Sequence, residues 1–571
     1  MLDTVSREPA LPIQSDYGYS EKQSGGPYRL AIAAAVILGF LVRAIHAVPK
    51  DFPLNDGGLF YAMVHDLQHA HYLIPPLTSY NAAGIPFAYP PLSFYIAGLL
   101  SKSTPLSLFD VFRFLPLIVS SLTVMALFLL AQSMLSSRRS IAVSVFVFAL
   151  IPRSFIWLLM GGGVARSFGL LFAILALQQA YLLYTRRSWA FAAPAAILSA
   201  LTILSHAETG WFLAFSIAIF FVARGRHRHG ILSSMAVATT TLLLTAPWWA
   251  TVFARHGIEP FLAANGTGGS IFSDSSTRNS ILLSILRLVS TSEPFYPLLG
   301  TLALLGLVAA LATRRFLLPA WWLLTIILDA RAFPTFITLP VAMLAGIGVT
   351  EVLLPAVETL TTGNRWWTQP QPRSNGHHRP GYWPEWLAGR RASTALLGII
   401  LCYGVGCALV TKSGLAGEGS ALVSLSNDER AAMHLVAQQT LPSSRFLLVT
   451  GANDWETDKT AEWFPVLAQR QSIATVQGYE WTTSKTFADR VDAYDAAHQC
   501  GYRFSTCLND WSAKWRVPFN YVYIPRSPGG QCCWTLVASL GGDSSYTRIY
   551  DGPGATIFVR HQATDAGAGR N

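Results

Sequence analysis

The apolar run YRLAIAAAVILGFLVRAIHAV occupies residues 28–48 of the chain. An α-helix rises about 1.5 Å per residue, so a run of this length crosses the roughly 30 Å hydrocarbon core of a bilayer. The polar residues 1–27 show no cleavable signal pattern, and the run lacks a small-residue cleavage site. We therefore expect an uncleaved first transmembrane span that follows an N-terminal tail.

The rest of the chain repeats this character. Of its 571 residues, 52% are hydrophobic and only 13% are charged, which excludes a soluble enzyme with an ordinary core. We predict a mainly α-helical polytopic membrane protein with about eleven transmembrane helices. Each predicted helix corresponds to an apolar run that approaches the length of a span. The predicted spans are centred near Ile37, Thr123, Val145, Ala173, Ala196, Ala218, Leu242, Leu304, Leu324, Leu344 and Leu401.

The net charge of +10 comes from short basic doublets between apolar runs. There is no basic face with interleaved aromatic residues, so we expect no nucleic-acid partner. With a cytoplasmic N-terminus (1–27), the basic clusters at 138–139, 186–187, 224–228, 314–315 and in the loop 355–392 all fall inside, as the positive-inside rule requires. An odd number of spans then places residues 411–571 outside the cell membrane.

The first outer loop, residues 48–109, contains two apolar pieces too short to be spans. From Asp56 to Ala70, the side chains of Leu59, Met63 and Leu67 share one helical face, and residues 90–100 begin at a proline pair. Both pieces are typical of helices that lie in the membrane interface.

Residues 411–571 alternate between helix-like and strand-like segments, which predicts a small α/β domain. Ser426 precedes Glu429 at capping-box spacing, and the turn DGPG at 551–554 predicts a closing hairpin. Four cysteines lie here and could form two disulfides: Cys500, Cys507, Cys532 and Cys533. Pairing of Cys500 with Cys507 is sterically easy, whereas the adjacent pair would be strained, so the connectivity stays open.

Three motifs carry a resemblance to a known family: NDGGLFYAMVHDL (55–67), YPPLSFYIAGLL (89–100) and GGGVARSFGLL (161–171). Across residues 28–410 the chain resembles the GT-C superfamily of membrane glycosyltransferases, which includes protein O-mannosyltransferases and the aminoarabinose transferase of lipid A. The resemblance implies transfer of a sugar from a polyprenyl-phosphate donor to an extracytoplasmic acceptor hydroxyl on a glycan, lipid or protein.

In that family the acidic residue of the first loop is implicated in catalysis, which points to Asp56 here. Many members carry a second acidic residue beside the first, whereas Gly57 and Gly58 follow in this chain. The pattern therefore names no certain cofactor, and it leaves a divalent metal ion open.

The chemistry of sugar transfer supports the same residues. A base must lie near the acceptor and positive groups near the leaving phosphate. Asp56 could be that base, or it could only cap the helix that follows it. The apolar run 316–328 is short, so Asp329 and Arg331 should lie below the outer surface and line a cavity. Arg331 could bind the phosphate, or pair with Asp329.

Other outer-facing turns supply further candidates. Arg166 could bind the phosphate or anchor its span at the interface. His206 and Glu208 could shape a sugar pocket or form a plain capping turn, and Glu293 and Tyr89 complete the substrate-binding set. The loop 255–279 is rich in small residues and could form a flap over the donor.

In the C-terminal part, aromatic and acidic residues gather in two motifs, ANDWETDKTAEWFP and VQGYEW. Such a set suits sugar binding, but the sequence favours the alternative, a packed core with solvated acidic edges. The residues are Asp454, Trp455, Glu456, Glu462, Trp463, Glu480 and Trp481. A rival function of another class is a transporter or flippase of lipid-linked glycans, but neither internal repeats nor paired broken helices are clear in the sequence.

Overall fold

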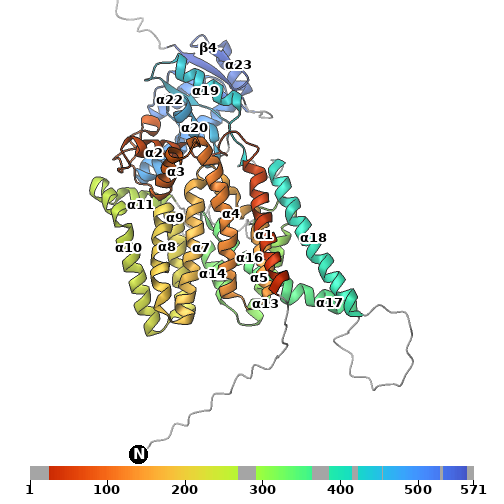
Figure 1. Cartoon of the computed structure of the whole chain (residues 1–571). Coiled ribbons are helices and arrows are strands. Elements are labelled where there is room, and N and C mark those ends of the chain that lie inside the picture. Colours follow the sequence, from red (N-terminus) through yellow and green to blue (C-terminus); the bar gives the residue numbers. More distant parts are fainter. Residues whose placement is uncertain are drawn as a thin grey trace, which may run out of the picture.

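A computed structural model describes residues 25–267, 291–362, 385–413, 422–452, 454–526 and 532–561. It contains a helical bundle, residues 25–413, and a C-terminal domain, residues 422–561, which covers one end of the bundle (Figure 1). The helices of the bundle are α1 Gly25–Ala47, α2 Gly58–His69, α3 Leu92–Ser103, α4 Leu108–Met134, α5 Arg138–Leu150, α6 Ile156–Leu159, α7 Gly163–Arg186, α8 Ala192–Ser205, α9 Ala207–Phe220, α10 Arg228–His256, α11 Glu259–Gly266, α13 Leu298–Ala312, α14 Leu317–Leu328, α15 Phe333–Phe336, α16 Thr338–Ile347, α17 Leu354–Thr362 and α18 Glu385–Ser413.

Several helices of the bundle have the length and apolar character of membrane spans. In the described part of the chain, seven helical segments are long and apolar enough to cross a membrane, or eight if the bent pair 138–150 and 152–159 is one span. Three apolar helices, α8 with its preceding turn, α13 and α14, are shorter. Every predicted span centre lies in a helix, but the predicted number of eleven spans is not confirmed.

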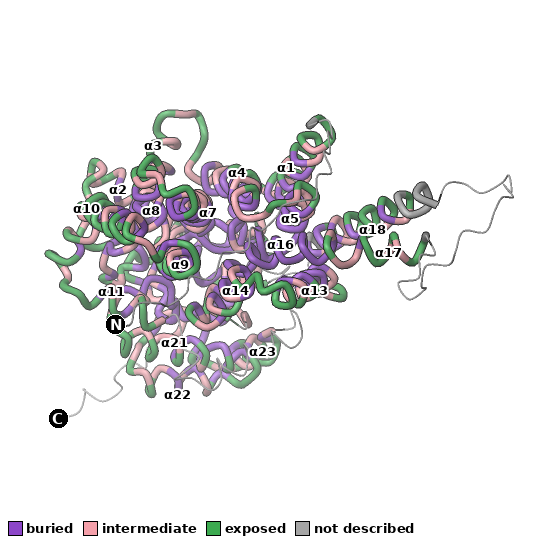
Figure 2. The backbone as a smooth tube through the Cα atoms, turned by 90° about the horizontal axis from the view of Figure 1, so that it is seen from below, coloured by how far each residue is buried: buried purple, intermediate pink, exposed green. Residues whose placement is uncertain are grey.

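The bundle is layered around a buried centre. Seen from below, α16 lies in the middle, whereas α10 and α18 lie at the perimeter (Figure 2). In the segment containing α16, 78% of the apolar window is buried, against 28% in α10 and in α18. Small residues permit this packing: a Cβ on Gly306 of α13 would lie 1.8 Å from the carbonyl oxygen of Leu344 in α16.

A fully buried arginine holds the break between α5 and α6. Arg43 of α1 donates to the carbonyl oxygen of Ala149 at 3.2 Å and to the hydroxyl of Ser154 at 3.4 Å. The chain bends by 80° at this break. Arg43 thus donates to a carbonyl oxygen that the end of α5 leaves without a helical partner. The bend changes the direction of the chain between α5 and α6.

The first loop forms the two predicted short helices, α2 and α3. The apolar face of α2 packs inside the protein, where Met63 and Leu67 are fully buried in one cluster with Phe94 of α3 and Phe112 of α4. Its polar face, with His65 and His69, is exposed. The amphipathic pattern therefore reflects burial against protein.

The C-terminal domain is an α/β domain built on a five-stranded sheet of order β2-β1-β3-β5-β4, parallel across its first three strands and antiparallel across the rest. Its elements are α19 Asn427–Gln439, β1 Arg445–Leu448, η8 Trp455–Thr457, α20 Lys459–Leu467, β2 Gln471–Ser472, α21 Ser484–Gln499, α22 Thr506–Trp515, β3 Tyr521–Pro525, α23 Trp534–Gly542, β4 Tyr546–Asp551 and β5 Ala555–Arg560. The capping box at Ser426 and the hairpin at 551–554 are confirmed. Both candidate disulfides form, Cys500 with Cys507 and Cys532 with Cys533.

The C-terminal domain is joined to the first loop beside Asp56. The indole nitrogen of buried Trp463 donates to the carbonyl oxygen of Asn55 at 2.7 Å, and Asn81 exchanges two hydrogen bonds with the backbone of Ser472. A bridge pairs Leu54 with Ser424. The C-terminal domain is thereby fixed over the residues that surround Asp56.

Three sequence predictions lie in part outside the described residues. They are the N-terminal tail, where residues 1–24 are not described, the basic loop 355–392, where 363–384 are not, and the flap 255–279, where residues from 268 are not.

Candidate functional site

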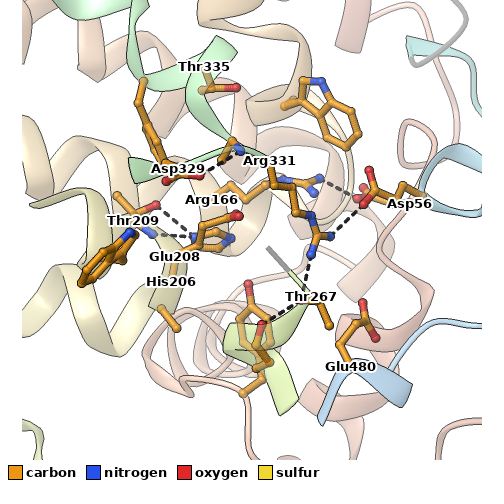
Figure 3. A pocket seen from close by; sticks show the side chains of 18 of the residues that line it. Asp56, Arg166, His206, Glu208, Thr209, Thr267, Asp329, Arg331, Thr335 and Glu480 are labelled. Carbon is orange, nitrogen blue, oxygen red and sulfur yellow. Dashed lines mark hydrogen bonds and ion pairs between the residues drawn. The ribbon is translucent and has the colours of Figure 1, made fainter. Parts of the chain in front are cut away.

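A cavity of about 560 Å³ lies between the helical bundle and the C-terminal domain. Its walls come from the first loop, the starts of α7 and α9, the turn after α14, the end of α11 and the C-terminal domain (Figure 3). The charged and histidine side chains that line it are Asp56, Arg153, Arg166, His206, Glu208, Asp329, Arg331, Glu456, Glu462 and Glu480. The cavity therefore combines several carboxylates with three guanidinium groups.

Asp56 is 8% exposed and is held by two contacts with the start of α7. Its Oδ1 accepts a hydrogen bond from the backbone N–H of Gly162 at 2.7 Å, and its Oδ2 lies 2.5 Å from Nη2 of Arg166. A Cβ on Gly162 would lie 2.7 Å from Oδ2, so only glycine allows this approach. The carboxylate meets the positive end of the α7 dipole.

Asp56 does not cap α2, which was the alternative interpretation of the sequence. That place belongs to Glu462 of α20, whose Oε1 accepts hydrogen bonds from the backbone N–H groups of Gly57 at 2.8 Å and Leu59 at 3.4 Å. Burial, followed by the negative charge of Asp56, raises the pKa of Glu462 above its ordinary value. A side chain from the C-terminal domain thus completes α2 and leaves Asp56 facing the cavity.

Two arginines flank one indole ring at the α7 side of the cavity. The guanidinium carbons of Arg153 and Arg166 lie 5.2 and 5.4 Å from the ring centroid of Trp157. Arg153 is 8% exposed and follows the bend after α5. Sequence reasoning missed Arg153; the proline that precedes it at the end of an apolar run is the one signal that could have suggested a charged residue at a break.

Arg331 binds partners other than Asp329. Its Nη2 lies 3.0 Å from Oε1 of Glu456, and its Nη1 donates to Oγ1 of Thr267 at 3.2 Å. Asp329 instead accepts a hydrogen bond from the backbone N–H of Ala332 at 3.0 Å. Both Arg331 and Asp329 line the cavity, as the short apolar run before them predicted.

The α9 side of the cavity carries His206, Glu208 and Tyr89. His206 caps α9, since its Nδ1 accepts from the backbone N–H of Thr209 at 3.2 Å, and its ring lies 6.1 Å from that of Tyr89. Glu208 lies in the first turn of α9. The capping interpretation of His206 is confirmed, and the same residue also lines the cavity.

Glu293 lies elsewhere. Its carboxylate accepts hydrogen bonds from the hydroxyl of Thr291 at 2.6 Å and from the backbone N–H groups of Leu299 and Gly300, at the start of α13. It does not line the cavity. Its position before a predicted span did not show that it lies away from the cavity. Glu293 instead accepts hydrogen bonds from N–H groups that the start of α13 leaves free.

The C-terminal domain contributes more to the cavity than the sequence indicated. The side chains of Trp455, Glu456, Glu480 and Trp481 line it, and the ring of Trp481 lies 5.5 Å from that of Tyr89. Burial raises the pKa of Glu480, and the charge of Arg331 opposes that rise. By contrast, Trp463 is fully buried in a core cluster. Trp463 is therefore a core residue, whereas sugar binding by the residues that line the cavity stays a prediction.

Among the described residues, no group of three or more His, Cys, Asp or Glu side chains is arranged to hold a metal ion.

No protein-family model matches the chain, and no curated protein matches it in sequence. Solved structures do match. The oligosaccharyltransferase of Archaeoglobus fulgidus in its apo form aligns with a TM-score of 0.53 at 12% identity, over 87% of this chain and 69% of that one. ArnT from Cupriavidus metallidurans, bound to undecaprenyl phosphate, aligns with a TM-score of 0.51 at 12% identity, over 96% of this chain and 100% of that one.

A third match is the arabinofuranosyltransferase AftD from Mycobacteria, with a TM-score of 0.51 at 15% identity, over 94% of this chain and 42% of that one. These neighbours are GT-C glycosyltransferases. At such low identities the likeness concerns the fold alone, so the chain shares its overall fold with these glycosyltransferases. The resemblance seen in the sequence motifs is confirmed at this level.

Proposed function

We propose that this chain is a glycosyltransferase that moves a sugar from a polyprenyl-phosphate-linked donor to an extracytoplasmic acceptor hydroxyl on a glycan, lipid or protein. The observation that carries the proposal is the Asp56–Arg166 pair at the wall of a cavity that also contains Arg153 and Arg331. The undecaprenyl phosphate bound to ArnT, which has the same fold, supports a lipid phosphate as the donor's carrier.

In the proposed reaction the acceptor oxygen attacks the anomeric carbon of the sugar. The bond between that carbon and the phosphate oxygen breaks, and the phosphate leaves with the electron pair. Asp56 accepts the proton of the acceptor hydroxyl. The N–H of Gly162 keeps the carboxylate oriented. When the donor binds, the guanidinium of Arg166 leaves Oδ2 of Asp56 and contacts the phosphate.

The leaving phosphate needs cations in a site that excludes water. Arg331 and Arg166 serve this role in the proposal. Arg153, which lies over the Trp157 ring and also lines the cavity, adds a third positive charge. A guanidinium can bind a phosphate through two parallel N–H groups. His206, Glu208 and Tyr89 would shape the sugar pocket beside them.

The proposed topology follows from the basic clusters. The N-terminus and the loop 355–392 lie in the cytoplasm, and the domain from residue 411 lies outside the cell membrane. The cavity would then open at the outer face, where membrane lipids and lipid-linked donors reach it.

The test is transfer of radiolabelled sugar by the purified full-length protein from a panel of polyprenyl-phosphate sugars, in nanodiscs, to a mixed acceptor extract. Labelled acceptor, with a mass increase of one sugar, supports the proposal. A mass increase of several sugars would point to a preassembled oligosaccharide. No transfer from any donor, together with movement of a lipid-linked glycan across a vesicle membrane, would favour a flippase.

A further inference from the structure

Arg331 connects three parts of the molecule. It belongs to the turn after α14 in the helical bundle, and it contacts Glu456 of the C-terminal domain at 3.0 Å. It also donates to Thr267, which follows the end of α11. One guanidinium at the cavity wall therefore holds both the C-terminal domain and the segment after α10.

The carboxylate of Glu456 occupies the place at Arg331 where another anion could bind. Its side chain is 29% exposed and that of Arg331 is 34% exposed, so both remain open to the cavity. In the part of the chain that the structure describes, the polar contact recorded for this carboxylate is the one to Arg331. A partly exposed ion pair of this kind is weak, so an incoming anion can replace it.

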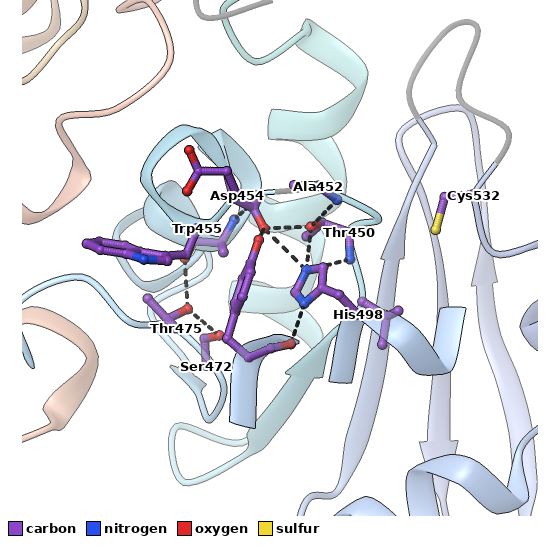
Figure 4. A network of polar contacts seen from close by, with 12 residues as sticks. Thr450, Ala452, Asp454, Trp455, Ser472, Thr475, His498 and Cys532 are labelled. Carbon is purple, nitrogen blue, oxygen red and sulfur yellow. Dashed lines mark hydrogen bonds and ion pairs between the residues drawn. The ribbon is translucent and has the colours of Figure 1, made fainter. Parts of the chain in front are cut away.

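The short helix η8, which carries Glu456, is anchored on both sides of this residue. The carbonyl oxygen of Trp455 accepts from Nε2 of Gln477 at 2.7 Å, and that of Thr457 accepts from Nδ2 of Asn55 at 3.1 Å. Asp458, which follows, is buried and bonded to Thr450 and to Tyr494, in the network beside His498 (Figure 4). Release of Glu456 therefore requires only that its own side chain rotates.

We propose that Glu456 is a positioning residue that occupies the anion site of Arg331 in the substrate-free cavity, and that the phosphate of the donor displaces it. This inference rests on the proposed function. The carboxylate holds the guanidinium in place over the cavity and neutralises it until a phosphate arrives. Donor binding then breaks a contact between the helical bundle and the C-terminal domain, next to Trp455 and Asn55.

The test measures the dissociation constant of undecaprenyl phosphate for the full-length protein in nanodiscs. Glu456→Gln keeps the shape of the side chain and removes its charge. Asp489→Asn is the matched control, because it removes one exposed carboxylate from the same domain, where it pairs with Lys485. We expect the dissociation constant to fall about two- to fivefold for Glu456→Gln and to stay unchanged for Asp489→Asn. Glu456→Asp, which keeps the charge, should stay close to the wild type.

Kinetics separate positioning from a purely structural role. For Glu456→Gln we expect the donor KM to fall while kcat does not rise. Equal or weaker binding by Glu456→Gln would overturn the inference and leave the proposed function standing. Absence of undecaprenyl phosphate binding to the wild type would overturn both.

Discussion

Nη2 of Arg166 lies 2.5 Å from Oδ2 of Asp56, and the two residues are 110 positions apart in the chain. The pair joins the first loop to the start of α7, at the wall of the cavity. It brings the proposed base and one of the proposed phosphate-binding cations to the same wall of the cavity.

The approach of Asp56 to α7 depends on Gly162. A Cβ there would lie 2.7 Å from Oδ2 of Asp56 and 2.8 Å from Nη2 of Arg166. Gly162→Ala should therefore separate the pair without removing either residue, and we expect the transfer rate to fall about ten- to a hundredfold. Gly398→Ala is the control, since a Cβ at Gly398 meets no atom within 4 Å. Equal rates for both variants would show that the pair is not needed in this geometry.

The stability of the protein should depend on pH through Glu462. Burial raises its pKa in the folded protein, so the folded state keeps a proton that the unfolded chain has lost above the ordinary value of about 4.5. Stability from this group is therefore lost as the pH rises above that value. Glu462→Gln retains an acceptor for Gly57 and Leu59 and removes the ionisation. We expect its melting temperature, relative to the wild type, to be higher at pH 8 than at pH 5. A difference that does not change with pH would contradict this.

Trp463 fixes the C-terminal domain to the residue before Asp56. Its indole N–H donates to the carbonyl oxygen of Asn55 at 2.7 Å, and its side chain is fully buried. Trp463→Phe leaves that buried carbonyl without its donor, which costs about 1–3 kcal/mol. We expect a lower melting temperature and slower transfer. In the same domain, Trp534 is 71% exposed, and Trp534→Phe should change neither.

Much of the fold could be predicted from local patterns. Apolar runs gave a helix at every predicted centre, and the capping box at Ser426 and the turn at 551–554 formed as expected, because these signals depend on neighbouring residues. The number of spans was less certain, since α8, α13 and α14 are shorter than a full crossing. Length and composition alone do not decide whether such helices cross a membrane.

Several residues of the candidate site could be predicted because the expected topology places them on the same side of the membrane. Asp56, Arg166, His206, Glu208 and Arg331 line one cavity, and the sequence had predicted that they share one side of the membrane. The partner of Arg331 was not predictable, because Glu456 lies 125 positions away in another domain. Arg153 escaped notice since it stands alone after an apolar run, and only the bend after α5 turns it inward.

The most direct measurement of the central claim compares the initial rates of sugar transfer by the wild type and by Asp56→Asn, from the same polyprenyl-phosphate sugar. Asparagine keeps an oxygen for the N–H of Gly162 and removes the base. We predict measurable transfer by the wild type and a rate at least about a hundredfold lower for the variant, with its melting temperature close to that of the wild type. Transfer by Asp56→Asn at the wild-type rate would contradict the assignment of Asp56 as the catalytic base.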